Sequence, residues 1–144
     1  MIWTTWENVG VDRMACAWFI KRYLDADAQF AFIPYGQLLA EKEHTFDTPD
    51  AEYSHKRGRC SFAMMVKAHT PRDKTLLMLA DIVDGADEAS DTLPPPESYG
   101  LEALCTGTRL KASSDAEALI EGLALYDALL CFLNSRSRNR GERK

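Results

Sequence analysis

Residues 2–33, IWTTWENVGVDRMACAWFIKRYLDADAQFAFI, contain the pattern of a strand, a helix and a second strand. Residues 2–6 are aromatic or β-branched, which favours a strand. Apolar residues at helical spacing predict a helix over residues 11–24, and residues 29–33 predict a second strand that ends before Pro34. A connection of this kind implies a right-handed crossover, and therefore a parallel pair of strands.

The rest of the chain predicts a mixed α/β fold. A helix over residues 37–43 and a third short strand over residues 44–46 would complete a small, mostly parallel sheet in the N-terminal half. A polar loop of residues 47–59 follows, and its length favours a functional role. We expect the sheet to pack against a helical C-terminal half, with helices over residues 60–69, from Thr70-Pro71 to Gly85, over 99–111, and over 115–133 after a capping box of Ser114 and Glu117.

Composition predicts one soluble domain. The chain has 144 residues, 46% of them apolar and 27% charged, with a net charge of −5. We expect a single domain over residues 1–134 and a basic, disordered tail over 135–144. The beginning of the chain has no signal-peptide pattern, and no apolar run approaches the ~20 residues of a membrane span. The sequence therefore predicts a cytoplasmic protein without membrane contact, whose acidic body disfavours direct nucleic-acid binding.

The polar loop carries the first candidate site. Glu52 and His55 stand three residues apart, and a carboxylate and an imidazole can share a metal ion if other residues complete the site. A histidine that simply hydrogen-bonds a neighbouring carboxylate is the alternative. Asp87 follows Gly85-Ala86, where the preceding helix is expected to end, so its carboxylate can turn inward.

Cys60 is the best candidate for a reactive thiol among four cysteines that occur singly and are expected to be reduced. It follows Arg57 and Arg59 and begins a predicted helix, and both features stabilise a thiolate. The two arginines with free backbone N–H groups would also bind a small oxyanion. The alternative is a cysteine buried where the helix joins the core.

Two further places carry charged residues of interest. Asp12, Arg13 and Cys16 lie at the start of the first helix, beside the carboxyl end of a strand, where α/β sheets bind ligands. The alternative is an acidic residue that favours the helix dipole next to a surface arginine. Asp127 is the only charge between residues 123 and 133, so it needs a partner, for which Arg13 and Arg109 are candidates.

Six short motifs together resemble the chromate-resistance protein family, whose domain stands at the C-terminus of bacterial chromate-resistance regulators. In chain order they are Asp12-Arg13-x-Ala15-Cys16-x-Trp18, Phe30-x-Phe32-Ile33-Pro34, Phe46-Asp47-x-Pro49-x-x-Glu52-x-x-His55, Cys60-Ser61-Phe62, Ala80-x-Ile82-Val83-x-Gly85-Ala86-Asp87, and Tyr126-Asp127-Ala128-Leu129. The family usually has Cys-Pro-Trp where this chain has Cys16-Ala17-Trp18. The resemblance implies a role in chromate tolerance or its sensing.

Three functions follow as expectations. The first is a domain that binds or senses chromate or a metal ion, with Glu52, His55 and Asp87 as ligands of Zn, Mn or Fe. Arg57 and Arg59 would then hold the anion, next to Cys60, Asp12 and Arg13 as reactive groups. The second is a hydrolase or oxidoreductase that uses the metal or the Cys60 thiol. The third is a homodimeric interaction module that has no small-molecule site.

Overall fold

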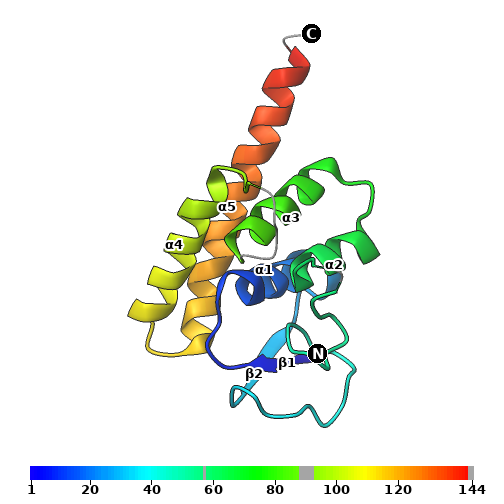
Figure 1. Cartoon of the computed structure of the whole chain (residues 1–144), viewed down its shortest axis with the longest axis vertical. Helices are drawn as coiled ribbons and strands as arrows, with labels where there is room; N and C mark the ends of the chain where they lie inside the picture. The colour runs from blue at the N-terminus through cyan, green and yellow to red at the C-terminus, as the bar shows by residue number, and fades with distance from the viewer. Residues whose placement is uncertain (57, 88–92, 143–144) are drawn as a thin grey trace.

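A computed structural model describes residues 1–56, 58–87 and 93–142, the last five of these as backbone only. Figure 1 shows a two-stranded sheet at one end of the molecule and helices over the rest. The elements in chain order are β1 (Ile2–Trp6), α1 (Val11–Phe19), η1 (Ile20–Leu24), β2 (Gln29–Ile33), α2 (Ser61–His69), α3 (Lys74–Ala86), α4 (Glu97–Lys111) and α5 (Asp115–Glu142). The predicted mixed α/β class is confirmed.

The two strands are parallel, as the opening of the sequence predicts. Ile2 pairs with Gln29 and Trp6 pairs with Ile33, so the strands are in register over their full length. Helix α1 crosses between them and ends in a single π-helical segment, η1, which closes with a hydrogen bond from the Asp25 N–H to the Ile20 carbonyl. The Asp25 carboxylate then accepts hydrogen bonds from the Trp3 indole and the chain's amino terminus. These bonds fix the crossover against β1.

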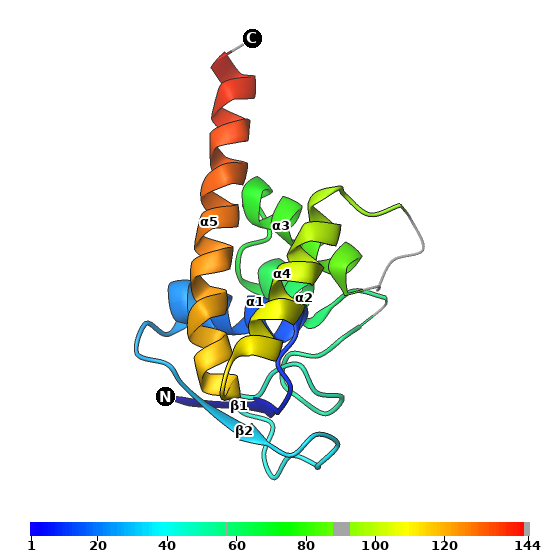
Figure 2. The same cartoon turned by 90° about the vertical axis from the view of Figure 1, so that its left-hand side faces the viewer.

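Helix α1 is the centre of the core. Its residues from Met14 to Phe19 are buried, and in both views it lies between the sheet and the other helices (Figures 1 and 2). Trp18 and Phe19 pack against Phe62 of α2, and Trp18 also packs against Tyr126 of α5. Burying a side chain of this size contributes roughly 1.5–3 kcal/mol. The start of α1 is therefore held firmly against α2.

The structure corrects the prediction for residues 34–47. Residues 37–43 form an irregular segment instead of a helix, and Leu38 within it is 77% exposed. The predicted third strand is reduced to two isolated parallel bridges, one between Thr4 and Thr45 and one between Phe46 and Tyr53. His44 and Asp47 both have left-handed backbones, with φ of 55° and 52°, and such residues interrupt a strand.

The helix boundaries around α3 also differ from the prediction. Thr70 ends α2, donating its hydroxyl to the Val66 carbonyl, and does not begin the next helix. Asp73 is the N-cap of α3 instead, because its carboxylate accepts the Leu76 N–H. Asp73 offers the charge that favours a helix N-terminus, whereas Pro71 lies outside the helix.

Helix α5 begins at the predicted capping box, where the Glu117 N–H donates to the Ser114 hydroxyl. In both views it runs beyond the other helices towards the C-terminus (Figures 1 and 2). Its backbone stays helical to Glu142, through most of the segment for which the sequence predicts a disordered tail. Within the described residues, no helix combines the length and the apolar character that a bilayer span requires.

Candidate metal centre

Asp12 joins the first turn of α1 to the N-terminus of α2. Its carboxylate is 3% exposed and accepts the backbone N–H groups of Ser61 at 3.0 Å and Phe62 at 2.9 Å. The first N–H groups of a helix lack partners within the helix, so an acceptor placed there satisfies them. The positive end of the helix dipole adds to the attraction. Asp12 is therefore a buried carboxylate that joins two helices. Arg13, the surface arginine of the alternative interpretation, has a side chain that is only 12% exposed.

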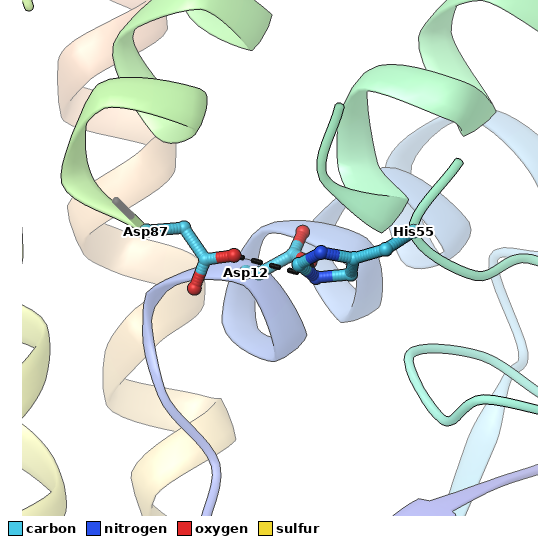
Figure 3. Close-up of side chains that lie close together, drawn as sticks. All are labelled: Asp12, His55 and Asp87. Atoms are coloured by element: carbon cyan, nitrogen blue, oxygen red, sulfur yellow. Dashed lines mark hydrogen bonds and ion pairs between the residues drawn. The ribbon is translucent and has the colours of Figure 1, made fainter. Parts of the chain in front are cut away.

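His55 brings three carboxylates together. Its Nε2 atom lies 3.0 Å from Asp12 Oδ2, 3.3 Å from Asp87 Oδ2 and 3.4 Å from Asp47 Oδ1. Figure 3 shows the imidazole reaching from its loop towards Asp12 on α1 and Asp87 at the end of α3. One ligand atom from each of Asp12, His55 and Asp87 lies within 4.8 Å of the other two. Segments far apart in the sequence thus meet at one point.

Asp47 supports this cluster from the side. Its Oδ1 accepts the Ser61 hydroxyl at 2.8 Å, and its Oδ2 lies 3.1 Å from Arg13 Nε. Arg13 also donates to the Asp47 carbonyl, which ties the residue at both its backbone and its side chain. The left-handed backbone of Asp47 costs roughly 1–3 kcal/mol for a residue other than glycine. These contacts hold the strained residue in place.

The carboxylates of the cluster titrate unusually. Burial, together with repulsion from Asp47, raises the pKa of Asp12 to about 7, while the hydrogen bond with His55 opposes that rise. Burial also raises the pKa of Asp87, to about 6. Burial acts in the same direction on Asp47, but His55 and Arg13 outweigh it and hold the pKa of Asp47 below its ordinary value.

His55 titrates in the opposite sense. Hydrogen bonds with Asp12 and Asp47 raise the pKa of His55 to about 10, so without a bound ion the ring is an imidazolium at neutral pH. The cluster then consists of one cationic ring among carboxylates. A divalent cation would replace the proton as the charge that balances them.

Asp84 lies one turn before Asp87 on α3 and contacts Arg59, which precedes α2. The Asp84 carboxylate accepts the Cys60 N–H at 2.8 Å and forms an ion pair with Arg59 Nε. Arg59 also pairs with Asp81 at 3.1 Å. Arg59 is thus bound to carboxylates of α3, and the structure does not present it as half of an oxyanion site. Arg57, the other predicted anion-binding residue, lies outside the described residues.

The Cys60 thiol is buried and acts as the N-cap of α2, accepting the Ala63 N–H at 3.4 Å. Burial and the nearby Asp12 and Asp84 carboxylates raise the pKa of the Cys60 thiol. The sequence predicts a lowered pKa for this thiol, because the nearby arginines and the helix N-terminus both favour a thiolate. The two carboxylates that come close to the thiol in the fold are not visible in the sequence. The alternative, a cysteine buried where the helix joins the core, therefore fits the structure better than a reactive thiol.

Two other predicted partnerships differ in the structure. The Glu52 carboxylate accepts the His44 N–H at 2.9 Å and is not part of the cluster around His55. Asp127 accepts the Trp18 indole N–H and forms a two-point ion pair with Arg22, in place of Arg13 or Arg109. It stands on an exposed part of α5, so its role is to anchor α5 against α1 and η1.

The donor set of one imidazole and two carboxylates suits a divalent first-row transition ion. Sequence reasoning finds His55 and Asp87 as ligands, but it places Asp12 among the reactive groups and does not single out Asp47. A signal for Asp47 exists in the sequence, since it stands in the same motif as His55, eight residues before it. Spacing alone does not reveal that a left-handed turn aims its carboxylate at the ring.

Comparisons with known proteins cover nearly the whole chain. The family model described as the ChrB C-terminal domain matches residues 3–133. Protein ChrB of Cupriavidus metallidurans strain CH34 is 29% identical over 134 residues, which is 92% of this chain. The chain spans 41% of the length of that relative. No solved structure matches this chain.

Proposed function

The chain belongs to the chromate-resistance ChrB family, and on this basis we propose that it is a chromate-responsive domain that binds a divalent transition-metal ion. Asp12, His55 and Asp87 would supply the ligands, and Asp47 would hold the His55 side of the site in place. The ion would then be the group through which the domain takes part in the response to chromate.

The position of His55 Nε2 carries the proposal. Two ligand atoms that each lie ~2.1 Å from one ion are about 3.0–3.4 Å apart, for angles between octahedral and tetrahedral. His55 Nε2 lies 3.0 Å from the Asp12 oxygen and 3.3 Å from the Asp87 oxygen, so small shifts would admit an ion between them. The imidazole and the two carboxylates come from three separate segments, so the fold limits how closely they can approach one another when no ion is bound.

The charge of the cluster favours a cation over chromate at this point. Three carboxylates surround the position, and a dianion placed among them would be repelled. Arg13 does not reverse this charge, because its guanidinium already donates to the carbonyls of Glu7, Asn8 and Asp47 and pairs with the Asp47 carboxylate. Direct binding of chromate to the bare cluster is therefore the weaker form of the proposal.

Carboxylate oxygens and one imidazole nitrogen are hard or borderline ligands, so Mn, Fe and Zn fit better than Cu(I). Cys16 is buried, and its Sγ lies 3.7 Å from Asp12 Oδ1, the oxygen that does not face His55. Burial and the Asp12 carboxylate raise the pKa of the Cys16 thiol, which opposes the thiolate that a soft ion would need.

Elemental analysis and metal titration of the purified domain test the proposal. We expect Mn(II) or Zn(II) to bind the wild-type chain with near one-to-one stoichiometry, and Asp12→Asn, His55→Gln and Asp87→Asn each to weaken binding by at least about tenfold. Glu52→Gln is a matched control for loss of a carboxylate, since Glu52 accepts the His44 N–H outside the proposed ligand set. His69→Gln is the control for loss of an imidazole, since His69 pairs with the Tyr53 hydroxyl.

The alternative is that protonated His55 simply clamps the three carboxylates. In that case, neither ion would bind the wild-type chain specifically, and the three variants would differ from it in stability alone. Equal losses of metal affinity in Glu52→Gln and Asp87→Asn would also contradict the proposed ligand set. Thermal unfolding of every variant, measured with a chelator present, separates weaker binding from loss of the fold.

A further inference from the structure

An open pocket of about 380 Å³ adjoins the residues of the proposed metal site. His55 and Asp47 line the pocket, so it adjoins the proposed ion on the side of the His55 ring. Its other lining residues are Trp6, Arg13, Thr48, Pro49 and Ser54. Pockets that bind small organic molecules commonly have volumes from roughly 300 to 1,000 Å³. A water molecule occupies about 30 Å³ in the liquid, so the space is far larger than a metal-bound water needs.

Thr48 marks the pocket wall as incomplete. It is 5% exposed, and its hydroxyl oxygen has no hydrogen-bond partner among the described residues. Buried hydroxyls nearly always have a partner, because leaving one without costs roughly 1–3 kcal/mol. Thr48 directly follows Asp47, whose left-handed backbone sets the direction of the chain here. An orphan polar group and a strained residue thus stand together at the pocket wall.

The lining is of two kinds. Trp6 and Pro49 carry the ring surfaces that suit an apolar body, while Thr48 and Ser54 are the hydroxyl-bearing residues of the lining. Arg13 lies over the Trp6 ring at 5.9 Å and keeps the indole near the pocket's charged end. Once a divalent ion has replaced the His55 proton, the ion and Arg13 balance the three carboxylates. The site then has no net formal charge, and its central cation can attract an acid group.

We propose that this pocket binds a small organic carboxylate with a flat, apolar body, whose acid group occupies a coordination position of the metal ion. The proposal rests on the metal site proposed above. Three ligands from the chain leave open positions on an ion, as in catalytic metal sites. The Thr48 hydroxyl, which is buried when no ligand is bound, would turn towards the acid group and gain a hydrogen-bond partner there, and Trp6 and Pro49 would contact the body. Without the ion, the three carboxylates outnumber the two cationic groups, Arg13 and His55, so the excess negative charge disfavours the acid.

Mn(II) is the ion for the test, because water-proton relaxation reports when a ligand displaces its bound water. The probes are benzoate, which has a flat body and an acid group, benzamide, which has no charge, and sulfate, which has no apolar body. We expect benzoate to bind the Mn(II)-loaded chain and to lower the relaxation enhancement, with benzamide and sulfate binding at least about tenfold more weakly. We expect no benzoate binding to the chelator-treated chain.

Thr48→Val keeps the shape of the side chain and removes the hydroxyl. We expect it to bind Mn(II) as the wild type does and to bind benzoate roughly three- to tenfold more weakly, the loss of one hydrogen bond. Ser54→Ala provides a second variant if Thr48→Val does not fold. Equal benzoate affinity in wild type and both variants, or benzoate binding independent of Mn(II), would overturn the inference.

Sulfate binding in preference to benzoate would also overturn it, in favour of an inorganic oxyanion. If Mn(II) binds and benzoate does not, the organic ligand is wrong and the metal site stands. If Mn(II) itself does not bind, the proposed function fails first, and this inference fails with it.

Discussion

Asp12 of α1 and Asp84 of α3 accept hydrogen bonds from consecutive N–H groups at the start of one helix, α2. Cys60 donates to Asp84, while Ser61 and Phe62 donate to Asp12. Two buried carboxylates from different elements thus share one helix N-terminus. The arrangement fixes α1 relative to α3, and Asp87 stands one turn beyond Asp84 at the end of α3. The distance between two proposed ligands therefore depends on a residue that is not a ligand.

We expect Asp84→Ala to lower the free energy of unfolding by roughly 2–3 kcal/mol, since the buried Cys60 N–H loses its partner and Arg59 loses an ion pair. The same change should weaken metal binding, because the end of α3 is no longer tied to α2. Chemical denaturation and metal titration measure the two effects.

Asp81→Ala is the matched control, since Asp81 pairs with the same arginine but is exposed. A surface pair of this kind contributes about 0–1 kcal/mol, so little change in stability or metal affinity is expected. Indistinguishable results for Asp84→Ala and Asp81→Ala would show that α2 does not depend on its second cap.

Gly85 packs the end of α3 against the start of α4. A Cβ atom there would lie 2.5 Å from both Pro94 Cβ and Ser98 Oγ, and Ser98 itself donates to the Ile82 carbonyl. Neither neighbour is the end of a long, flexible side chain, so we expect Gly85→Ala to destabilise the fold by about 1–3 kcal/mol.

Gly107 provides the contrast, because it lies inside α4 with nothing within 4 Å of an added Cβ. Alanine is the better helix former, so Gly107→Ala should stabilise the chain by up to about 1 kcal/mol. Thermal unfolding of both variants checks the pair. A stabilised Gly85→Ala variant would mean that α4 can move away from α3 to make room for the Cβ atom without lowering the free energy of unfolding.

The sequence predicts those parts of the fold that local patterns encode. The first strand follows from its aromatic and β-branched residues, the crossover helix from helical spacing, and the second strand from the residues before Pro34, while the Ser114 cap is visible in the sequence. Residues 37–43 have helical composition but no apolar face to bury, and tertiary contacts decide their path. Trp6, for example, donates its indole N–H to the Gln37 carbonyl. That bond joins segments with no visible relation in the sequence.

The candidate site is predicted only in part, for the same reason. The sequence identifies His55 and Asp87 individually, but the short spacing between Glu52 and His55 suggests a partnership that the loop does not form. The partners of His55 come from 43 residues before it, at Asp12, and from the end of α3. Both become neighbours because α2 takes its caps from α1 and α3, which is a property of packing.

The thiols offer a direct test of the enzyme alternative that relies on Cys60. Cys16, Cys60 and Cys105 are buried, whereas Cys131 is exposed on α5. We expect a thiol reagent to modify Cys131 rapidly in the native chain and the other three only after unfolding, because burial raises the pKa of each of these thiols and blocks access. The Cys131→Ser variant should then show no rapid phase. A rapid phase that disappears in Cys60→Ser would restore the reactive-thiol interpretation.

Metal affinity should rise with pH. An ion that binds His55 must displace its proton, and in the metal-free chain the pKa of His55 is about 10. At every pH below that value the ion competes with a proton, so the apparent dissociation constant should fall roughly tenfold per pH unit between about pH 7 and about pH 8. Below pH 7 the dependence should steepen, because protonation of Asp12, whose pKa is about 7, and then of Asp87, at about 6, removes further ligands.

Calorimetry in buffers of different ionisation enthalpy measures this exchange directly, through the release of about one proton per ion near pH 8. His55→Gln removes the imidazolium, so its remaining weak binding should lose the dependence caused by His55. Because His55 holds down the pKa values of Asp12 and Asp87, the dependence that remains should come from these two carboxyl groups and should end once both are ionised. His69→Gln, which keeps His55, should retain the wild-type slope. Wild-type affinity that does not change between about pH 7 and about pH 8 would exclude His55 as a ligand, whatever the stoichiometry of the ion.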